Sequence, residues 1–305
     1  MKSKCIMLMA IEARGGFMNN RNEYNGFFNN VYIPEKFAVN ILQHILLNSV
    51  KIEQYHPAPI LAIQGIMGEG KTYMTQNLLI AKGIQYKLIS GSILAGSNEG
   101  AGVDVFDFYY DDVRASIENG WYGVLVIDDF HLSTAATLSN AGHTTNAENL
   151  VGHLMNIADR QNGIIVPMIL IGNDFTKLYP PLMRAGRMNI FDWEPSFDDK
   201  LIIVRQLLRE RGFDQRVCSD NQILEFVQKY SNQYLAFFSQ SIEKVYIDKF
   251  NNIVYSFMNS KEYFPKERLY NGIAEAFDNS GPVFSELLEA AEAILRRQPK
   301  KYDTK

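Results

Sequence analysis

The sequence predicts an α/β fold, in which a parallel sheet flanked by helices is followed by a small helical domain. Residues 65–72, GIMGEGKT, stand between an apolar run at 59–63 and a helix-prone run at 73–82. A second apolar run, 123–127, ends in two acidic residues. Apolar strands that alternate with helices favour a parallel sheet. After Pro195 the composition becomes that of helices, which marks the second domain.

Composition and charge argue against several classes of protein. The 305 residues suffice for one large or two modest domains, and 47% hydrophobic with 21% charged residues is ordinary for a globular chain. A net charge of −4 argues against a broad basic surface for nucleic acid. Cys5 and Cys218 make neither a disulfide framework nor a metal cluster, so we expect a reducing, cytoplasmic setting. The apolar run 5–11 is short for a secretion signal, and no run approaches the roughly 18 residues of a membrane span.

The elements follow from apolar runs, caps and turn residues, taken in order along the chain. Residues 1–30 predict a mobile arm, and loops are expected at 90–100 and 131–146, which are rich in small and polar residues. Buried strands are expected at 59–63, 86–89, 123–127, 164–171 and 188–193. Helices are expected at 34–48, 73–82, 103–118, 147–160, 197–211, 220–230, 234–258, 265–277 and 283–297. The predicted domains are therefore an α/β domain at 31–194 and a helical lid at 195–298, followed by a tail at 299–305.

Residues 65–72 fit the phosphate-loop pattern, with glycine at the first and sixth positions followed by lysine and threonine. The glycines let backbone N–H groups turn toward an anion, and the helix behind them adds its dipole. Lys71 would reach the β and γ phosphates, and the Thr72 hydroxyl would hold Mg²⁺. The sequence therefore predicts a site for ATP and Mg²⁺, with contacts from Gly65, Met67, Gly68, Glu69, Gly70, Lys71, Thr72 and Tyr73.

Further polar residues complete a candidate hydrolytic site. Asp128 and Asp129 end a buried strand, where α/β sheets place their ligands; Asp128 would hold Mg²⁺ and Asp129 would polarise the attacking water. Asn173 follows the next strand and could orient that water, although alone it is more typical of a turn. Arg184 and Arg187 are either surface charges or arginines that reach the phosphates of a neighbouring subunit. The candidate catalytic residues are thus Lys71, Asp129, Asn173, Arg184 and Arg187, and the candidate metal ligands are Thr72 and Asp128.

The order of these motifs resembles that of AAA+ ATPases and, among them, rubisco activase of the green type. The matching segments are GEGKT at 68–72, LMNIAD at 154–159, VPMILIGNDF at 166–175 and LYPPLMRAGRM at 178–188. Residues 90–100 are similar to the first pore loop of that family, and Gly281-Pro282 followed by Phe284 is similar to its C-terminal segment. The resemblance covers residues 30–298 and is strongest from 147 to 193.

This resemblance implies a five-stranded parallel sheet in the AAA+ order, and a ring, usually a hexamer, with ATP at the subunit interfaces. Hydrolysis would move pore loops that pull on a protein client; in rubisco activase this releases inhibitory sugar phosphates from rubisco. Two lid arginines of the family, the first usually a γ-phosphate sensor, are replaced here by Ile242 and Lys244. The plant-type domain that engages rubisco is not expected in this sequence, and neither is a tail like the rubisco small subunit.

Other functions remain open at this point. An AAA+ ATPase could remodel a protein complex other than rubisco, which the expected lack of rubisco-binding appendages favours. A monomeric kinase or switch would need an acceptor pocket and would leave Arg184 and Arg187 unexplained. A DNA-linked ATPase is disfavoured by the acidic balance. We therefore expect self-assembly and a protein client, with neither nucleic acid nor membrane as a partner.

Overall fold

A computed structural model describes residues 26–28, 30–50, 55–95, 100–130, 145–159, 163–176, 178–259, 270–271 and 281–297. The chain divides after Glu194 into two compact units, which are described separately.

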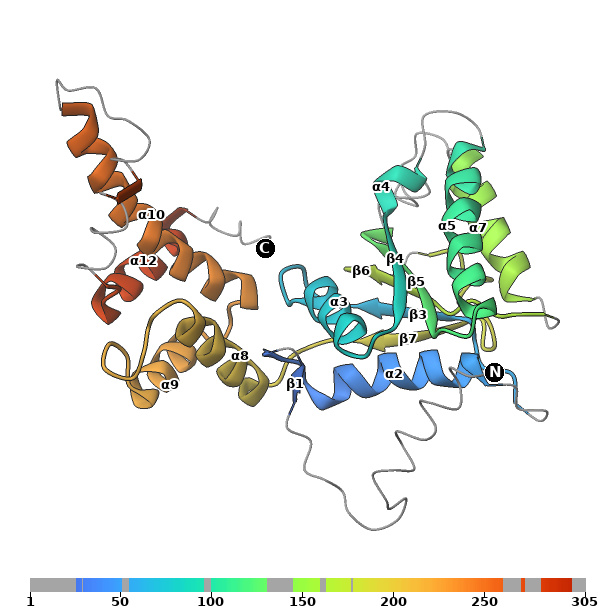
Figure 1. Ribbon diagram of the computed structural model, residues 1–305, viewed down its shortest axis with the longest axis horizontal. Coiled ribbons are helices and arrows are strands. Elements are labelled where there is room, and N and C mark those ends of the chain that lie inside the picture. Colours follow the sequence, from blue (N-terminus) through green and yellow to red (C-terminus); the bar gives the residue numbers. More distant parts are fainter. Residues whose placement is uncertain are drawn as a thin grey trace, which may run out of the picture. The chain divides into compact units, whose positions relative to one another are not determined.

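The first unit is built on a five-stranded sheet in which every pairing is parallel (Figure 1). The strand order is β4-β5-β6-β3-β7, which confirms the predicted sheet. The strands are β3 Ile60–Gln64, β4 Gln85–Ser90, β5 Gly123–Asp128, β6 Met168–Gly172 and β7 Met188–Asp192. The strand expected at 164–171 begins only at Met168, directly after Pro167, which has no N–H to offer a neighbouring strand.

Helices cover both faces of this sheet, so the first unit has three layers (Figure 1). The helices are α2 Glu35–Ser49, α3 Lys71–Ala81, α5 Ala101–Glu118 and α7 Thr145–Ala158. Side chains along a strand alternate between the faces: Leu61 and Ile63 pack with α2 and α3, whereas Ile60 and Ala62 pack with α5 and α7. Both faces are apolar, and β3 and β5 therefore consist of almost continuous buried runs.

The sequence did not predict two short elements of this unit. Helix α4, Gly91–Leu94, lies within the segment expected to be a flexible loop, because the Ser90 side chain caps it by accepting from the Ser92 N–H at 3.3 Å. An antiparallel hairpin of β1, Phe27–Phe28, and β2, Val31–Tyr32, begins within the expected arm. The remainder of the predicted arm and loops, at 1–25, 96–99 and 131–144, lies outside the described residues.

The second unit is helical in the part that the structure describes. Its helices are α8 Phe197–Glu210, α9 Asp220–Lys229, α10 Leu235–Asn259 and α12 Phe284–Arg297. They enclose an aromatic core in which Phe226, Phe237 and Phe238 are fully buried and meet edge to face. Apart from residues 270–271, the helix expected at 265–277 lies outside the described residues. Within the described chain, no helix is both long and apolar enough to cross a membrane.

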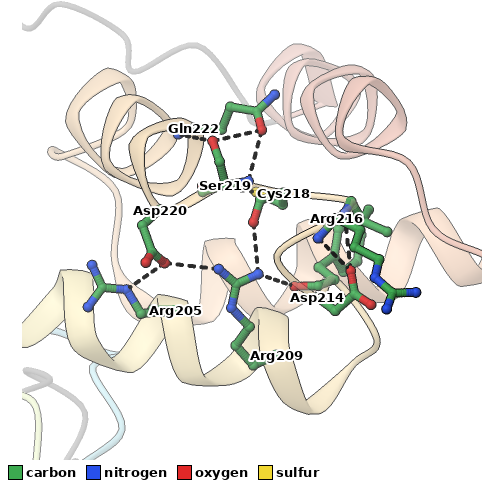
Figure 2. A network of polar contacts seen from close by, with 10 residues as sticks. Arg205, Arg209, Asp214, Arg216, Cys218, Ser219, Asp220 and Gln222 are labelled. Carbon is green, nitrogen blue, oxygen red and sulfur yellow. Dashed lines mark hydrogen bonds and ion pairs between the residues drawn. The ribbon is translucent and has the colours of Figure 1, made fainter.

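The connection between α8 and α9 is held by one guanidinium (Figure 2). Arg209 Nη1 donates to the carbonyl oxygens of Phe213 at 2.6 Å and Cys218 at 2.8 Å, and Nη2 donates to Asp220 Oδ1 at 2.9 Å. The Cys218 side chain is buried, and this burial raises the pKa of its thiol to about 11. Arg209 therefore fixes the loop between the two helices and the start of α9 together.

Candidate nucleotide site

The phosphate loop follows β3 at the carboxyl edge of the sheet and leads directly into α3. Gly70 caps α3 in the left-handed conformation, with φ of 74°. Gly65 lies against the backbone of β7: a Cβ placed there would be 2.2 Å from the Trp193 carbonyl oxygen. Only glycine fits at Gly65 without moving the backbone, so the loop shape depends on it.

Lys71 lies inside this loop rather than in solvent. Its ammonium donates to the carbonyl oxygens of Gly65 at 2.7 Å and Ile66 at 2.9 Å, and the residue is only 6% exposed. Burial lowers the pKa of Lys71, and the nearby charges of Asp128, Glu69 and Asp129 oppose that shift. The loop thus holds a positive charge at its centre, where an anionic phosphate would be bound.

The metal-binding residues predicted from sequence meet in the structure. Thr72 Oγ1 donates to Asp128 Oδ1 at 2.8 Å, although the two residues are 56 positions apart. A hydroxyl and a carboxylate are hard oxygen ligands, which Mg²⁺ prefers, so this donor pair fits the ion.

Asp129 follows directly after β5 in a left-handed conformation, with φ of 50°. Its N–H donates to Asp128 Oδ1 at 3.0 Å, which ties the two acids to each other. A non-glycine residue in this region costs about 1 kcal/mol, and such strain is found preferentially at functional sites.

Asn173 lies beside the phosphate loop, because β6 and β3 are neighbours in the sheet. The Gly65 N–H donates to the Asn173 carbonyl oxygen at 3.3 Å. The structure therefore brings together Lys71, Thr72, Asp128, Asp129 and Asn173 at one edge. Of the other predicted nucleotide contacts, Glu69 is buried, whereas Met67 and Tyr73 are exposed.

Two residues that support this site were not predicted from the sequence. Trp193 Nε1 donates to the Glu69 carbonyl oxygen at 2.8 Å, so the indole braces the phosphate loop from 124 residues away. Gln64 connects two strands: its amide nitrogen donates to Asp192 Oδ1 at 2.6 Å, and its oxygen accepts from the Phe175 N–H at 2.7 Å. No local pattern could have indicated these contacts, because they depend on which strands become neighbours.

Arg184 and Arg187 do not join this cluster. The Ile60 N–H donates to the Arg187 carbonyl oxygen at 3.3 Å, which places Arg187 at the amino edge of the sheet where β3 begins. The phosphate loop follows the other end of β3. The four residue steps of β3 from Ile60 to Gln64 span about 13 Å, which is longer than an arginine side chain.

The two arginines also differ from each other. Arg187 Nε and Nη2 donate to the two oxygens of Asp159 at 2.7 and 2.6 Å, and Nη1 donates to the Pro181 carbonyl oxygen at 2.7 Å. These hydrogen bonds lower the pKa of Asp159 and raise that of Arg187. Arg184 is exposed to solvent.

The two lid positions where arginines were replaced have structural partners within the second unit. Ile242 is 3% exposed and belongs to the hydrophobic core of that unit. The Lys244 ammonium donates to both carboxylate oxygens of Asp248, at 2.9 and 2.8 Å, one turn along α10.

The comparisons with known proteins agree with this geometry. Residues 61–194 match the family model described as ATPase family associated with various cellular activities (AAA). The chain is 29% identical over 282 residues to a ribulose bisphosphate carboxylase/oxygenase activase of Nostoc sp., covering 88% of this chain and 66% of the relative. It is 26% identical over 301 residues to the chloroplastic activase of Phaseolus vulgaris, covering 90% of this chain and 64% of the relative. The chain thus spans slightly less than two thirds of the length of these relatives. The predicted resemblance is confirmed for this domain: residues 61–194 match the AAA ATPase family.

Proposed function

We propose that this chain is an ATP-hydrolysing motor that assembles into a ring and remodels a protein client. The observation that carries the proposal is the cluster of Lys71, Thr72, Asp128 and Asp129, formed where α3 begins after β3 and where β5 ends. Thr72 and Asp128 would hold Mg²⁺, which would neutralise charge on the β and γ phosphates.

The chemistry assigned to the protein residues is simple. Lys71 binds the phosphates, Asp129 accepts a hydrogen bond from the attacking water, and Asn173 holds that water in line with the γ-phosphate. Water is a poor nucleophile, so a carboxylate next to it is the group this reaction needs.

Assembly is proposed because neither Arg184 nor Arg187 lies with the cluster at the carboxyl edge. Arg184 and Arg187 lie at the opposite edge, about 13 Å of strand away from their own phosphate loop. If either of these two arginines stabilises a transferred phosphoryl group, that group therefore belongs to another copy of the chain. A monomeric kinase would leave neither arginine with a role at the nucleotide, so the location of these residues favours the ring.

The client proposed is rubisco, on the strength of the named relatives, and release of inhibitory sugar phosphates is the reaction this implies. A second candidate is a different protein complex. It is favoured by the lid, where Ile242 is buried and Lys244 is bound to Asp248, so neither presents the free cation of the family pattern. A reducing compartment such as the cytoplasm belongs to this proposal, because Cys218 is a buried free thiol.

Hydrolysis is tested with Lys71→Ala and Asp129→Asn in a phosphate-release assay with Mg²⁺ and ATP. Lys71→Ala is expected to abolish nucleotide binding, whereas Asp129→Asn should still bind and turn over ~10²-fold more slowly. Asp111→Asn, an exposed acid on α5, is the matched control and should behave as wild type. Unchanged turnover in Asp129→Asn would remove that residue from the mechanism.

The client is tested separately with rubisco that carries a tight-binding sugar phosphate. The wild type with ATP should restore carboxylation, and Asp129→Asn should not. If ATP is hydrolysed but several rubisco forms stay inhibited, the client is another protein. In that case, capture of partners by the Asp129→Asn variant, which should bind ATP and hydrolyse it only slowly, is the next experiment.

A further inference from the structure

The guanidinium of Arg187 has all three of its nitrogens engaged within its own chain. Two parallel hydrogen bonds join it to the Asp159 carboxylate at 2.7 and 2.6 Å, and a third reaches the Pro181 carbonyl oxygen at 2.7 Å. A paired fork of this kind is both stronger and more directional than a single ionic contact. Arg187 would have to break all three bonds to reach a phosphate on another chain.

The partners of Arg187 come from two separate segments of the chain. Asp159 follows the end of α7, and Pro181 opens the turn that leads to β7. The same turn is closed by backbone bonds from the Arg187 N–H to the Arg184 carbonyl oxygen at 3.0 Å and from the Met183 N–H to the Pro180 carbonyl oxygen at 3.1 Å. The side chain of Leu182, which is fully buried in the core of the first unit, anchors this turn. Arg187 therefore fixes the turn that carries Arg184.

Arg184 is in the opposite situation. Its side chain is exposed, and its charge contributes to the lowered pKa of Asp159 without a hydrogen bond in the described part of the chain. It can reorient at no cost in broken hydrogen bonds.

We propose that the two arginines have different roles: Arg184 is the guanidinium that reaches the nucleotide of a neighbouring copy, and Arg187 is a positioning residue that holds the turn through Asp159. This division rests on the proposed function, since it needs a ring with shared sites. It makes Asp159, which the sequence did not single out, part of the catalytic support.

The test is a double-mutant cycle on turnover with Arg187→Ala, Asp159→Asn and the two combined. A misplaced catalytic group costs up to about 10²-fold, so each single variant should lower kcat by about 10- to 10²-fold. The combined variant should be no worse than Arg187→Ala alone, because that substitution already removes the contact with Asp159. Arg184→Ala should lose more, about 10³-fold or more, with nucleotide affinity retained in every case.

Two further measurements separate positioning from simple destabilisation. The pair is exposed on the Asp159 side, so its loss should leave Tm close to that of wild type while kcat falls. The charge-exchanged variant, Asp159→Arg with Arg187→Asp, should recover part of the lost kcat. Arg114→Ala is the matched control, because Arg114 forms a comparable surface ion pair with Asp111 and should keep wild-type turnover.

The outcome against this inference is specific. If Arg187 itself contacts a phosphate, Arg187→Ala will be as defective as Arg184→Ala, Asp159→Asn will keep full turnover, and the charge exchange will restore nothing. The proposed function is judged by a different result. Arg184→Ala subunits mixed with Lys71→Ala subunits should regain activity, since some interfaces join an intact loop to an intact Arg184. If mixed rings form and stay inactive, the shared site is wrong whatever the role of Arg187.

Discussion

His44 makes the stability of the first unit sensitive to acid. It lies on α2, is 6% exposed, and its Nε2 is 3.1 Å from the Met168 carbonyl oxygen at the start of β6, to which the neutral ring donates. Burial lowers the pKa of His44 from 6.5 to about 4, and the hydrogen bond to Met168 only partly opposes this. Between about pH 4 and pH 6.5, the ring is therefore mostly neutral in the folded protein and mostly charged in the unfolded chain.

The magnitude follows from these two pKa values. Because the pKa of His44 is lower in the folded protein, the unfolded chain binds one more proton than the folded chain between pH 6.5 and pH 4. The free energy of unfolding therefore keeps its full value above this range and decreases as the pH falls through it. Between pH 7 and pH 5 this linkage amounts to about 2 kcal/mol of lost unfolding free energy. It approaches about 3 kcal/mol, which corresponds to the full difference between the two pKa values, well below pH 4.

Urea unfolding at pH 7 and pH 5, followed by tryptophan fluorescence, measures this effect. Trp193 is 2% exposed and belongs to the same unit as His44, so a Trp121→Phe background gives a local reporter. The stability of His44→Gln, which keeps an N–H donor but does not titrate, should fall by about 2 kcal/mol less between the two pH values than that of the parent. His153→Gln, at a partly exposed histidine, is the control. Equal pH dependence in the parent and His44→Gln would refute the assignment of the buried neutral ring.

Other residues give predictions with different readouts. Gly65→Ala should weaken nucleotide binding at least tenfold in a titration with a fluorescent ATP analogue, because its Cβ would collide with the Trp193 carbonyl oxygen; Gly152→Ala, with open space around it, should bind normally. Leu182→Ala should lower the free energy of unfolding in urea by about 2–5 kcal/mol, and it should also slow turnover, since the buried side chain anchors the turn that carries Arg184. Wild-type turnover under conditions in which the variant is fully folded would limit the role of Leu182 to stability. Arg209→Ala should speed hydrogen exchange in residues 212–220 and destabilise the second unit by about 2 kcal/mol, whereas Arg205→Ala, whose Nε is 3.3 Å from Asp220 Oδ1, should have a small effect. A nucleotide analogue that is not hydrolysed should produce a ring-sized species in light scattering, and a monomer at every concentration would contradict the shared site.

The sequence was most informative where a function depends on neighbouring residues. The phosphate loop at 65–72 and the acids at the end of β5 could be predicted because spacing within one segment determines their chemistry. The order of the strands came from family resemblance, since each apolar run fits several places in a sheet. Helix α4 was missed because one turn gives too short a pattern for periodicity.

The parts of the site that could not be predicted depend on distant partners. Trp193 and Glu69 meet across 124 residues, and Arg187 and Asp159 across 28. Only the folded structure distinguishes Arg184 from Arg187, because the two differ in what surrounds them and not in residue type.

The position of Trp193 also determines how the second unit is attached. Its backbone N–H donates to the Gln64 carbonyl oxygen at 2.7 Å, and its indole N–H donates to the Glu69 carbonyl oxygen, so both its backbone and its side chain are held by residues 64–69. The second unit begins at Pro195, only two residues further on. The connection to the second unit is therefore anchored at the phosphate loop, and a movement of that loop would displace Trp193, two residues before the second unit begins.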